Sequence, residues 1–158
     1  MTYYIDIQNA TDEPLMMDED TLTRIASLTL RDFQHDAELT LRFVTQEEIT
    51  HLNHTYRKKN KPTNVLAFPS VIPDEIELEC PFLGDVIVCP SVLLTESKEL
   101  NKTLDEHWTL ILIHGILHLL GYDHIQDDDA AVMQAIEIKL LAERGYANPY
   151  DAEGNQLE

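Results

Sequence analysis

The spacing of hydrophobic residues along the chain changes between two periods. Four short segments alternate apolar and polar residues, or are short apolar runs bordered by turn residues, and both patterns are typical of β-strands. Five longer segments repeat apolar residues every three or four positions, as amphipathic helices do. The strands are predicted at residues 3–8, 38–45, 64–68 and 86–88, and the helices at about 18–33, 45–56, 90–100, 103–120 and 128–144. The pattern therefore predicts one α+β domain built in layers.

The predicted helix from Thr103 to Leu120 differs from the other four because it is apolar on nearly all sides. A helix of this kind is buried, so we expect it at the centre of the fold. Thr103 and Glu106 form a capping box at its start. Gly121 can adopt a left-handed backbone conformation, which ends the helix and turns the chain back.

This central helix also carries the candidate chemistry. His114 and His118 are four residues apart, so their side chains project from the same face about one turn apart. His124 follows the predicted turn and is placed to supply a third nitrogen. A lone histidine on an apolar helix is usually a core residue with a hydrogen-bond partner, but three within eleven residues favour a metal site. Three protein ligands with one open position are typical of catalytic zinc.

The spacing of the three histidines is that of the metzincin peptidases. Those enzymes carry a glutamate directly after the first histidine, and it takes a proton from the metal-bound water. Gly115 occupies that place here and has no proton acceptor on its side chain. The sequence therefore argues against peptide hydrolysis by the usual route, and we expect Gly115 to leave room beside the metal.

Charge is distributed unevenly along the chain. The formal net charge of −18 argues against a general nucleic-acid coat protein, because phosphates are repelled at long range. Four of the eleven Lys and Arg residues nevertheless fall within five positions, at Arg57, Lys58, Lys59 and Lys61. Such a run is often a solvated loop, but it can also hold a phosphate backbone.

Length and the ends of the chain add further expectations. A chain of 158 residues corresponds to a single domain by size. The N-terminus lacks the pattern of a secretory signal, and the longest apolar run, residues 110–120, is too short to span a bilayer, so the cytoplasm is expected. The acidic, polar tail after about residue 147 has no apolar pattern, and we expect it to be mobile and dispensable.

Two further segments complete a family resemblance. Residues 52–57 run into 62–69 (Pro-Thr-Asn-Val-Leu-Ala-Phe-Pro), and residues 83–86 read Leu-Gly-Asp-Val. Together with the segment 114–124 they resemble the YbeY family of bacterial metal-dependent endoribonucleases, which act in ribosomal RNA maturation. The similarity extends over nearly the whole chain, from about Leu39 to Glu137.

The resemblance implies a zincin-like fold, with a small mixed four-stranded sheet packed on about five helices around the histidine-bearing helix. It implies that His114, His118 and His124 bind one zinc ion per chain. Arg57 matches the functional arginine of the family. Arg57 and His114 are therefore the expected catalytic residues.

Two positions depart from the family pattern. Asn64 and Ala67 stand where the family more often has Asp and Ser. Asparagine keeps the hydrogen-bonding capacity of aspartate and loses its charge, which puts any catalytic role of that carboxylate in question here. Ala67 is expected to change only local packing.

The leading hypothesis is a zinc-dependent endoribonuclease specific for single-stranded RNA, acting in ribosomal RNA maturation and ribosome quality control. Arg57 can hold two phosphate oxygens at once, and Lys58, Lys59 and Lys61 would contact neighbouring phosphates. The expected partners are single-stranded and ribosomal RNA, with ribosomal proteins or a GTPase as further candidates. Neither DNA nor a membrane is expected.

Two alternatives belong to other classes. A metallopeptidase could recruit its base from Asp85 or Asp123, although Asp123 could equally orient a histidine. A non-catalytic, zinc-stabilised factor could bind the ribosome through acidic faces. The missing glutamate argues against the first alternative, and the open three-ligand site argues against the second.

Overall fold

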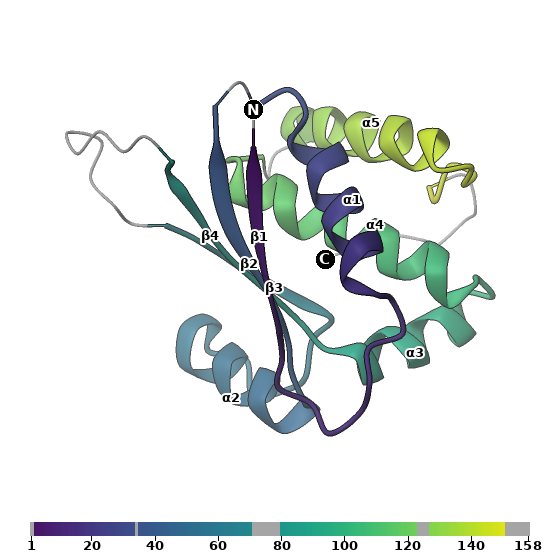
Figure 1. Cartoon of the computed structure of the whole chain (residues 1–158). Helices are drawn as coiled ribbons and strands as arrows, with labels where there is room; N and C mark the ends of the chain where they lie inside the picture. Colours follow the sequence, from purple (N-terminus) through teal and green to yellow (C-terminus); the bar gives the residue numbers. More distant parts are fainter. Residues whose placement is uncertain (1, 34, 71–79, 123–126, 151–158) are drawn as a thin grey trace.

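The computed structural model describes residues 2–33, 35–70, 80–122 and 127–150, and its elements follow one another as the hydrophobic pattern predicts (Figure 1). The strands are β1 (Tyr3–Asn9), β2 (Ala37–Phe43), β3 (Val65–Pro69) and β4 (Phe82–Val88). The helices are α1 (Glu19–Leu30), α2 (Gln46–Arg57), α3 (Pro90–Glu99), α4 (Leu104–Leu119) and α5 (Asp127–Glu143). The acidic segment 74–79, predicted to be a loop or hairpin connection, lies outside the described residues.

The four strands form one mixed sheet in the order β1-β2-β4-β3. β1 pairs with β2 and β2 pairs with β4 in parallel, whereas β3 runs antiparallel to β4. Parallel neighbours require a crossover, and α1 makes the crossover between β1 and β2. The predicted α+β architecture with a small mixed sheet is therefore confirmed.

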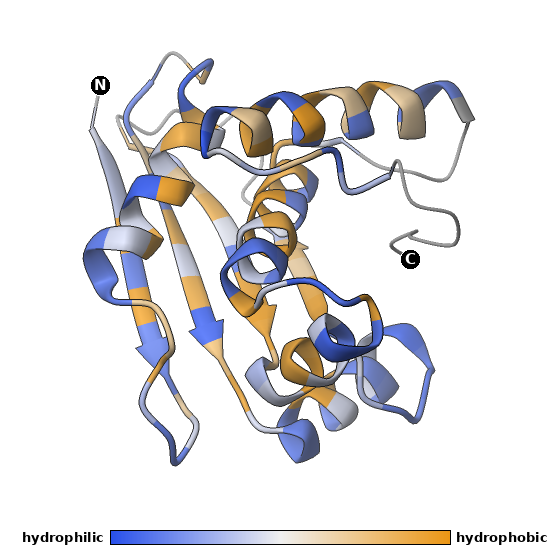
Figure 2. Cartoon of the chain, turned by 90° about the vertical axis from the view of Figure 1, so that its right-hand side faces the viewer, coloured by the Kyte–Doolittle hydropathy of each residue, from blue (hydrophilic) through white to orange (hydrophobic). Residues whose placement is uncertain are grey.

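Helix α4 forms the centre of the main core. Its residues from His107 to Leu117 are all buried, in agreement with the prediction of a central buried helix. It packs on the inner faces of β3 and β4 and is flanked by α1, α3 and α5 (Figure 1). Trp108 of α4 stacks on Phe43 of β2 with ring centroids 5.2 Å apart. Hydrophobic residues gather where the helices face the strands, and hydrophilic residues lie on the outer surfaces (Figure 2).

A second, smaller core lies on the other face of the sheet and holds α2. Ile49 of α2 packs with Leu66 of β3 and with Ile87 and Cys89 at the end of β4. Side chains alternate between the two faces along a strand, so these residues point away from α4. Near the other end of α2, the Tyr56 ring packs edge-on against Phe68 of β3 with centroids 5.2 Å apart, which places the basic segment that follows next to β3.

The predicted helix starts agree with the structure, whereas α1 ends at Leu30, three residues before its predicted end. The Thr45 and Thr103 hydroxyls each accept a hydrogen bond from the backbone N–H three residues later, at 3.2 Å. Asp18, rather than Asp20, caps α1 and accepts from the Thr21 N–H at 2.7 Å. Gly121 follows α4 with a φ of 99°, the left-handed conformation expected there.

The end of the chain departs from its prediction. Pro149 is buried, and the Tyr150 side chain reaches into the body of the protein, where its hydroxyl donates to Glu137 of α5. The packing of residues 148–150 on the body argues against mobility there, and whether the tail is dispensable stays a prediction. Residues 151–158 lie outside the described part of the chain. Among the described helices, none has the length and apolar composition needed to cross a membrane.

Candidate metal and phosphate site

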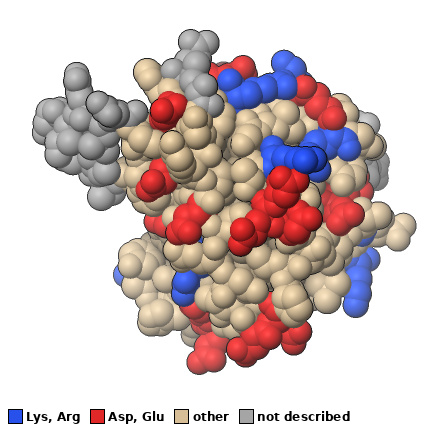
Figure 3. Space-filling model, viewed as in Figure 1, with Lys and Arg blue, Asp and Glu red and all other residues tan. Residues whose placement is uncertain are grey.

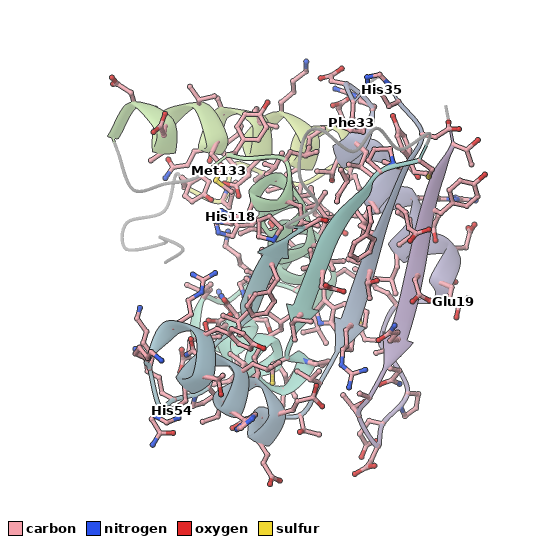
Figure 4. The ribbon with its side chains drawn as sticks, turned by 90° about the vertical axis from the view of Figure 1, so that its left-hand side faces the viewer. Glu19, Phe33, His35, His54, His118 and Met133 are labelled. Atoms are coloured by element: carbon pink, nitrogen blue, oxygen red, sulfur yellow. The ribbon has the colours of Figure 1, made fainter. Side chains whose placement is uncertain are left out.

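His114 and His118 converge on one point. Their Nε2 atoms are 3.2 Å apart, and the two rings are nearly perpendicular at 84°. Two nitrogens that bind one zinc ion at about 2.05 Å with a tetrahedral angle lie about 3.3 Å apart. The observed separation therefore fits two ligands of one metal ion. Figure 4 shows His118 in the region between α5 and α2.

The third predicted ligand, His124, lies outside the described residues, as does Asp123. Within the described ranges, no group of three His, Cys, Asp or Glu side chains is arranged to hold a metal ion. The structure thus places two of the three predicted ligands side by side.

Glu137 of α5 holds the His114 ring from the other side. Its Oε2 atom is 2.7 Å from His114 Nδ1, and both side chains are almost fully buried. The Tyr150 hydroxyl donates to the second carboxylate oxygen, Oε1, at 2.5 Å. Burial, together with the nearby Glu137 charge, raises the pKa of Tyr150 far above its usual value, so the phenol stays protonated and donates.

Neither Glu137 nor Tyr150 was expected from the sequence to belong to the site. A signal was present for Glu137, which lies on the same stripe of α5 as the buried residues Met133, Leu140 and Leu141. A charged residue inside an apolar helical stripe needs a buried partner. No such signal exists for Tyr150, whose partner is found only in three dimensions.

A cavity of about 420 Å³ opens onto the two histidines. Arg57, Lys59 and Lys61 line it together with His114 and His118. The Arg57 side chain is exposed and has one long contact, 3.5 Å from Nη2 to the Ala67 carbonyl. Three of the four predicted phosphate-binding residues therefore share a cavity with the histidine pair.

Lys58 does not line this cavity. It ends α2 in the left-handed conformation, with a φ of 61°. Its Nζ atom lies 3.4 Å from the Thr55 carbonyl, near the carboxyl end of the helix. The tight turn at Lys58 directs its side chain differently from those of its neighbours Arg57 and Lys59. The left-handed backbone at Lys58 therefore separates this residue from Arg57, Lys59 and Lys61, which line the cavity.

Asn64, one of the two departures from the family pattern, lines the cavity and has a defined partner. Its Nδ2 atom lies 3.3 Å from both carboxylate oxygens of Glu96. Glu96 also contacts Nε2 of the fully buried His107 at 2.9 Å. An aspartate at position 64 would oppose a second carboxylate here, whereas the amide donates to it. Asn64 therefore suits this network.

Gly115 lines the cavity together with the two histidines, but the direction in which its side chain would point is filled by the sheet. A Cβ atom there would stand 2.7 Å from Val86 Cγ1 and 3.2 Å from Val65 Cγ2. Glycine permits α4 to approach the sheet closely. The position that carries the catalytic glutamate in peptidases therefore faces Val86 and Val65 in this fold.

Asp85, the other described candidate for a peptidase base, also lies in the wrong place. It follows Gly84 and precedes Val86 on β4, and these two neighbours face α4. Successive side chains on a strand point to opposite faces, so Asp85 points away from the histidines. Of the two bases considered for peptide hydrolysis, the one that the structure describes is excluded by the sheet.

Comparisons with known proteins agree with the resemblance. The family model described as endoribonuclease YbeY matches residues 6–145. A Legionella pneumophila (strain Corby) protein named endoribonuclease YbeY is 67% identical over 158 residues, which is 100% of both chains. A Pseudomonas putida protein of the same name is 48% identical over 146 residues, 92% of each chain. The solution structure of TM1509 from Thermotoga maritima matches with a TM-score of 0.62 and 26% identity, over 97% of this chain and 99% of that one. The chain belongs to the YbeY endoribonuclease family.

Proposed function

We propose that this protein is a zinc-dependent endoribonuclease that cuts single-stranded RNA in the maturation and quality control of ribosomal RNA. Its relatives carry the name endoribonuclease, which supports the reaction class. The observation that carries the proposal is the convergent histidine pair in a cavity lined by Arg57, Lys59 and Lys61. A metal site and a phosphate-binding rim thus share one cavity.

His114 and His118 would hold the zinc ion, with His124 as the third ligand. The Nε2 separation of 3.2 Å is the property of the described residues that supports this assignment. When bound, zinc supplies a Lewis acid that polarises a phosphoryl oxygen and lowers the pKa of water from ~15.7 to ~7. This chemistry reduces the need for a strong protein base, in keeping with Gly115.

Arg57 is the residue suited to the scissile phosphate or its neighbour. Its planar guanidinium can donate to two phosphate oxygens at once. Among the described residues, its hydrogen bond to the Ala67 carbonyl is long, at 3.5 Å, which leaves the side chain able to reorient. A phosphodiester gains negative charge in the transition state, and a positioned cation stabilises that charge. Lys59 and Lys61 extend the same positive rim toward adjacent phosphates.

The depth of the site favours single-stranded RNA. His114 is only 3% exposed, so the scissile phosphate must enter the cavity. A single strand can bend and turn its bases outward, whereas an A-form duplex holds its phosphates on a stiff surface. Figure 3 shows acidic side chains spread over the face that carries β1 and α1, with some basic side chains among them. The basic rim of the cavity is therefore the surface best suited to RNA.

The first test is metal content and substrate class. The wild-type protein should bind about one zinc ion per chain, and His118→Ala should lose stoichiometric binding. The zinc-loaded protein should cut a structured RNA in its single-stranded regions and leave casein intact. Cleavage of casein with no cleavage of RNA would support the metallopeptidase alternative. Cleavage of neither substrate, with zinc bound, would support the non-catalytic factor.

The second test isolates Arg57. Arg57→Ala should lower RNA cleavage by about ten- to a thousandfold, because losing one charge-stabilising contact in the transition state costs about 1.4–4 kcal/mol. Arg57→Lys should recover part of the rate, since a point charge cannot reproduce the planar fork. Zinc content should stay unchanged in both variants.

Lys58→Asn is the matched control for Arg57→Ala. It removes one positive charge at the adjacent position, outside the cavity, and asparagine tolerates the left-handed conformation found there. RNA cleavage by Lys58→Asn should stay within about twofold of wild type. Equal losses in the two variants would show that only the overall charge of the segment matters, and would remove Arg57 from the site.

A further inference from the structure

We propose that Glu137 and Tyr150 form a clamp that positions His114 for metal binding, so that the C-terminal segment of the chain controls zinc affinity. The inference rests on the proposed zinc site. It assigns positioning roles to two residues that touch neither the cavity nor the substrate. The clamp joins three parts of the chain: α4, α5 and the segment that follows α5.

The contact with Glu137 bears on the tautomer of His114. Glu137 Oε2 is 2.7 Å from Nδ1, and an ionised carboxylate can only accept a hydrogen bond. In the proposed clamp Nδ1 donates to this carboxylate, so Nδ1 carries the proton and Nε2 keeps its lone pair. That lone pair is on the atom that faces His118 Nε2 at 3.2 Å. The carboxylate thus selects the tautomer that a metal ion requires.

The carboxylate of Glu137 is itself held in place. Glu137 is 1% exposed, and both of its oxygens are engaged, one by His114 and one by the Tyr150 hydroxyl at 2.5 Å. A carboxylate held at one oxygen alone can rotate about its last bond, whereas one held at both oxygens cannot. The His114 ring therefore has a fixed orientation before any metal arrives.

Tyr150 is held by the folded segment that follows α5. Its backbone N–H donates to the Asn148 side chain at 2.8 Å, and the preceding Pro149 is buried. The Tyr146 N–H donates to the Leu141 carbonyl at 2.9 Å, which turns the chain back after α5. Tyr150 thus arrives at Glu137 through a folded segment. Loss of its hydroxyl should be felt at the metal, although Tyr150 does not line the cavity.

The experiment measures zinc affinity by competition with a chromophoric chelator, on the full-length chain. Groups that hydrogen-bond to metal ligands typically change metal affinity about 10- to 100-fold when mutated. Glu137→Ala should weaken zinc binding by about 100-fold. Tyr150→Phe, which removes one oxygen atom, should weaken it by about tenfold. Tyr146→Phe is the matched control, because it makes the same change in the same segment, whereas the two Glu137 oxygens are engaged by His114 and Tyr150.

A second measurement separates positioning from simple folding. Nitrogen-15 NMR of the metal-free protein reports which ring nitrogen of His114 carries the proton. The wild type and Tyr146→Phe should show the Nδ1-protonated form, and Glu137→Ala should show a mixture of both tautomers. A purely structural role for Glu137 would lower the melting temperature and leave the tautomer unchanged.

The outcomes distinguish this inference from the proposed function. If Tyr150→Phe and Glu137→Ala bind zinc as tightly as wild type while His118→Ala does not, the clamp is wrong and the zinc site stands. If the wild type itself binds no zinc, both fail. If Glu137→Ala does not fold, Tyr150→Phe still decides, because affinity equal to that of Tyr146→Phe overturns the clamp.

Discussion

Gly115 offers the sharpest test of how α4 packs on the sheet. In an exposed helix, replacing glycine by alanine stabilises the protein by about 1 kcal/mol, because alanine loses less conformational freedom on folding. At this position the added Cβ would lie 2.7 Å from Val86 Cγ1 and 3.2 Å from Val65 Cγ2. The packing and the helix propensity therefore favour opposite outcomes for Gly115→Ala.

The distances indicate which effect wins. Carbon atoms in contact are about 3.5–4.0 Å apart, so the helix must retreat from β4 by several tenths of an ångström, or Val86 must leave its rotamer. Val86 is branched at Cβ and fully buried, which leaves it little freedom to move. Overpacking of this kind costs about 1–3 kcal/mol. After the propensity gain, Gly115→Ala should lower the free energy of unfolding by about 1 kcal/mol.

The assay is equilibrium urea denaturation followed by the fluorescence of the single tryptophan, Trp108, which is buried in the main core. A double-mutant cycle with Val86→Ala removes the clashing methyl group. The alanine at 115 then fills part of the cavity left at 86, so the two substitutions should couple favourably by about 0.5–3 kcal/mol. Stabilisation by Gly115→Ala, with no coupling to Val86→Ala, would refute the packing argument.

Two further predictions concern the segment after α5 and the start of α1. Deleting residues 148–158 should lower the melting temperature more than deleting residues 151–158. Only the longer deletion removes the buried Pro149 and the Tyr150 hydroxyl that holds Glu137. Equal melting temperatures of the two deletions would show that residues 148–150 contribute nothing to stability. The hydrogen bond from the Thr21 backbone N–H holds the pKa of the Asp18 carboxyl below its usual value. The ionised carboxyl therefore stabilises the folded protein above about pH 3.9, and this contribution is lost as the pH falls through the lowered pKa of the folded state. Asp18→Ala should therefore melt below wild type at pH 7 and close to it near pH 2, in thermal scans monitored by circular dichroism; a pH-independent difference would contradict this assignment.

The local features of this protein could be predicted from its sequence because they depend on residues close together in the chain. The period of the apolar residues indicated four strands and five helices, and the all-apolar segment before Gly121 indicated the central helix. His114 and His118 share a face through helix geometry alone. The cap residues Thr45 and Thr103 bond within a single turn, so sequence spacing was enough to identify them.

Other features were decided by packing between distant segments. The sequence placed a glycine after His114, but only the approach of α4 to β4 shows that valines fill the space beside it. Lys58 is indistinguishable from Lys59 in the sequence, and the left-handed turn at Lys58 separates them. These outcomes depend on where a side chain points once two elements have packed.

The partner of His114 shows the same limit most clearly. Glu137 is 23 residues from His114 and 13 residues from Tyr150, and no periodic pattern connects the three. Their contact arises when α5 folds over α4 and the following segment turns back onto both helices. Secondary structure depends on interactions within a few residues, and the sequence therefore determined it. Only the tertiary structure decided which buried polar groups meet. A buried polar group without a hydrogen bond costs free energy, and the packing of distant segments determines which group is near enough to bond with it.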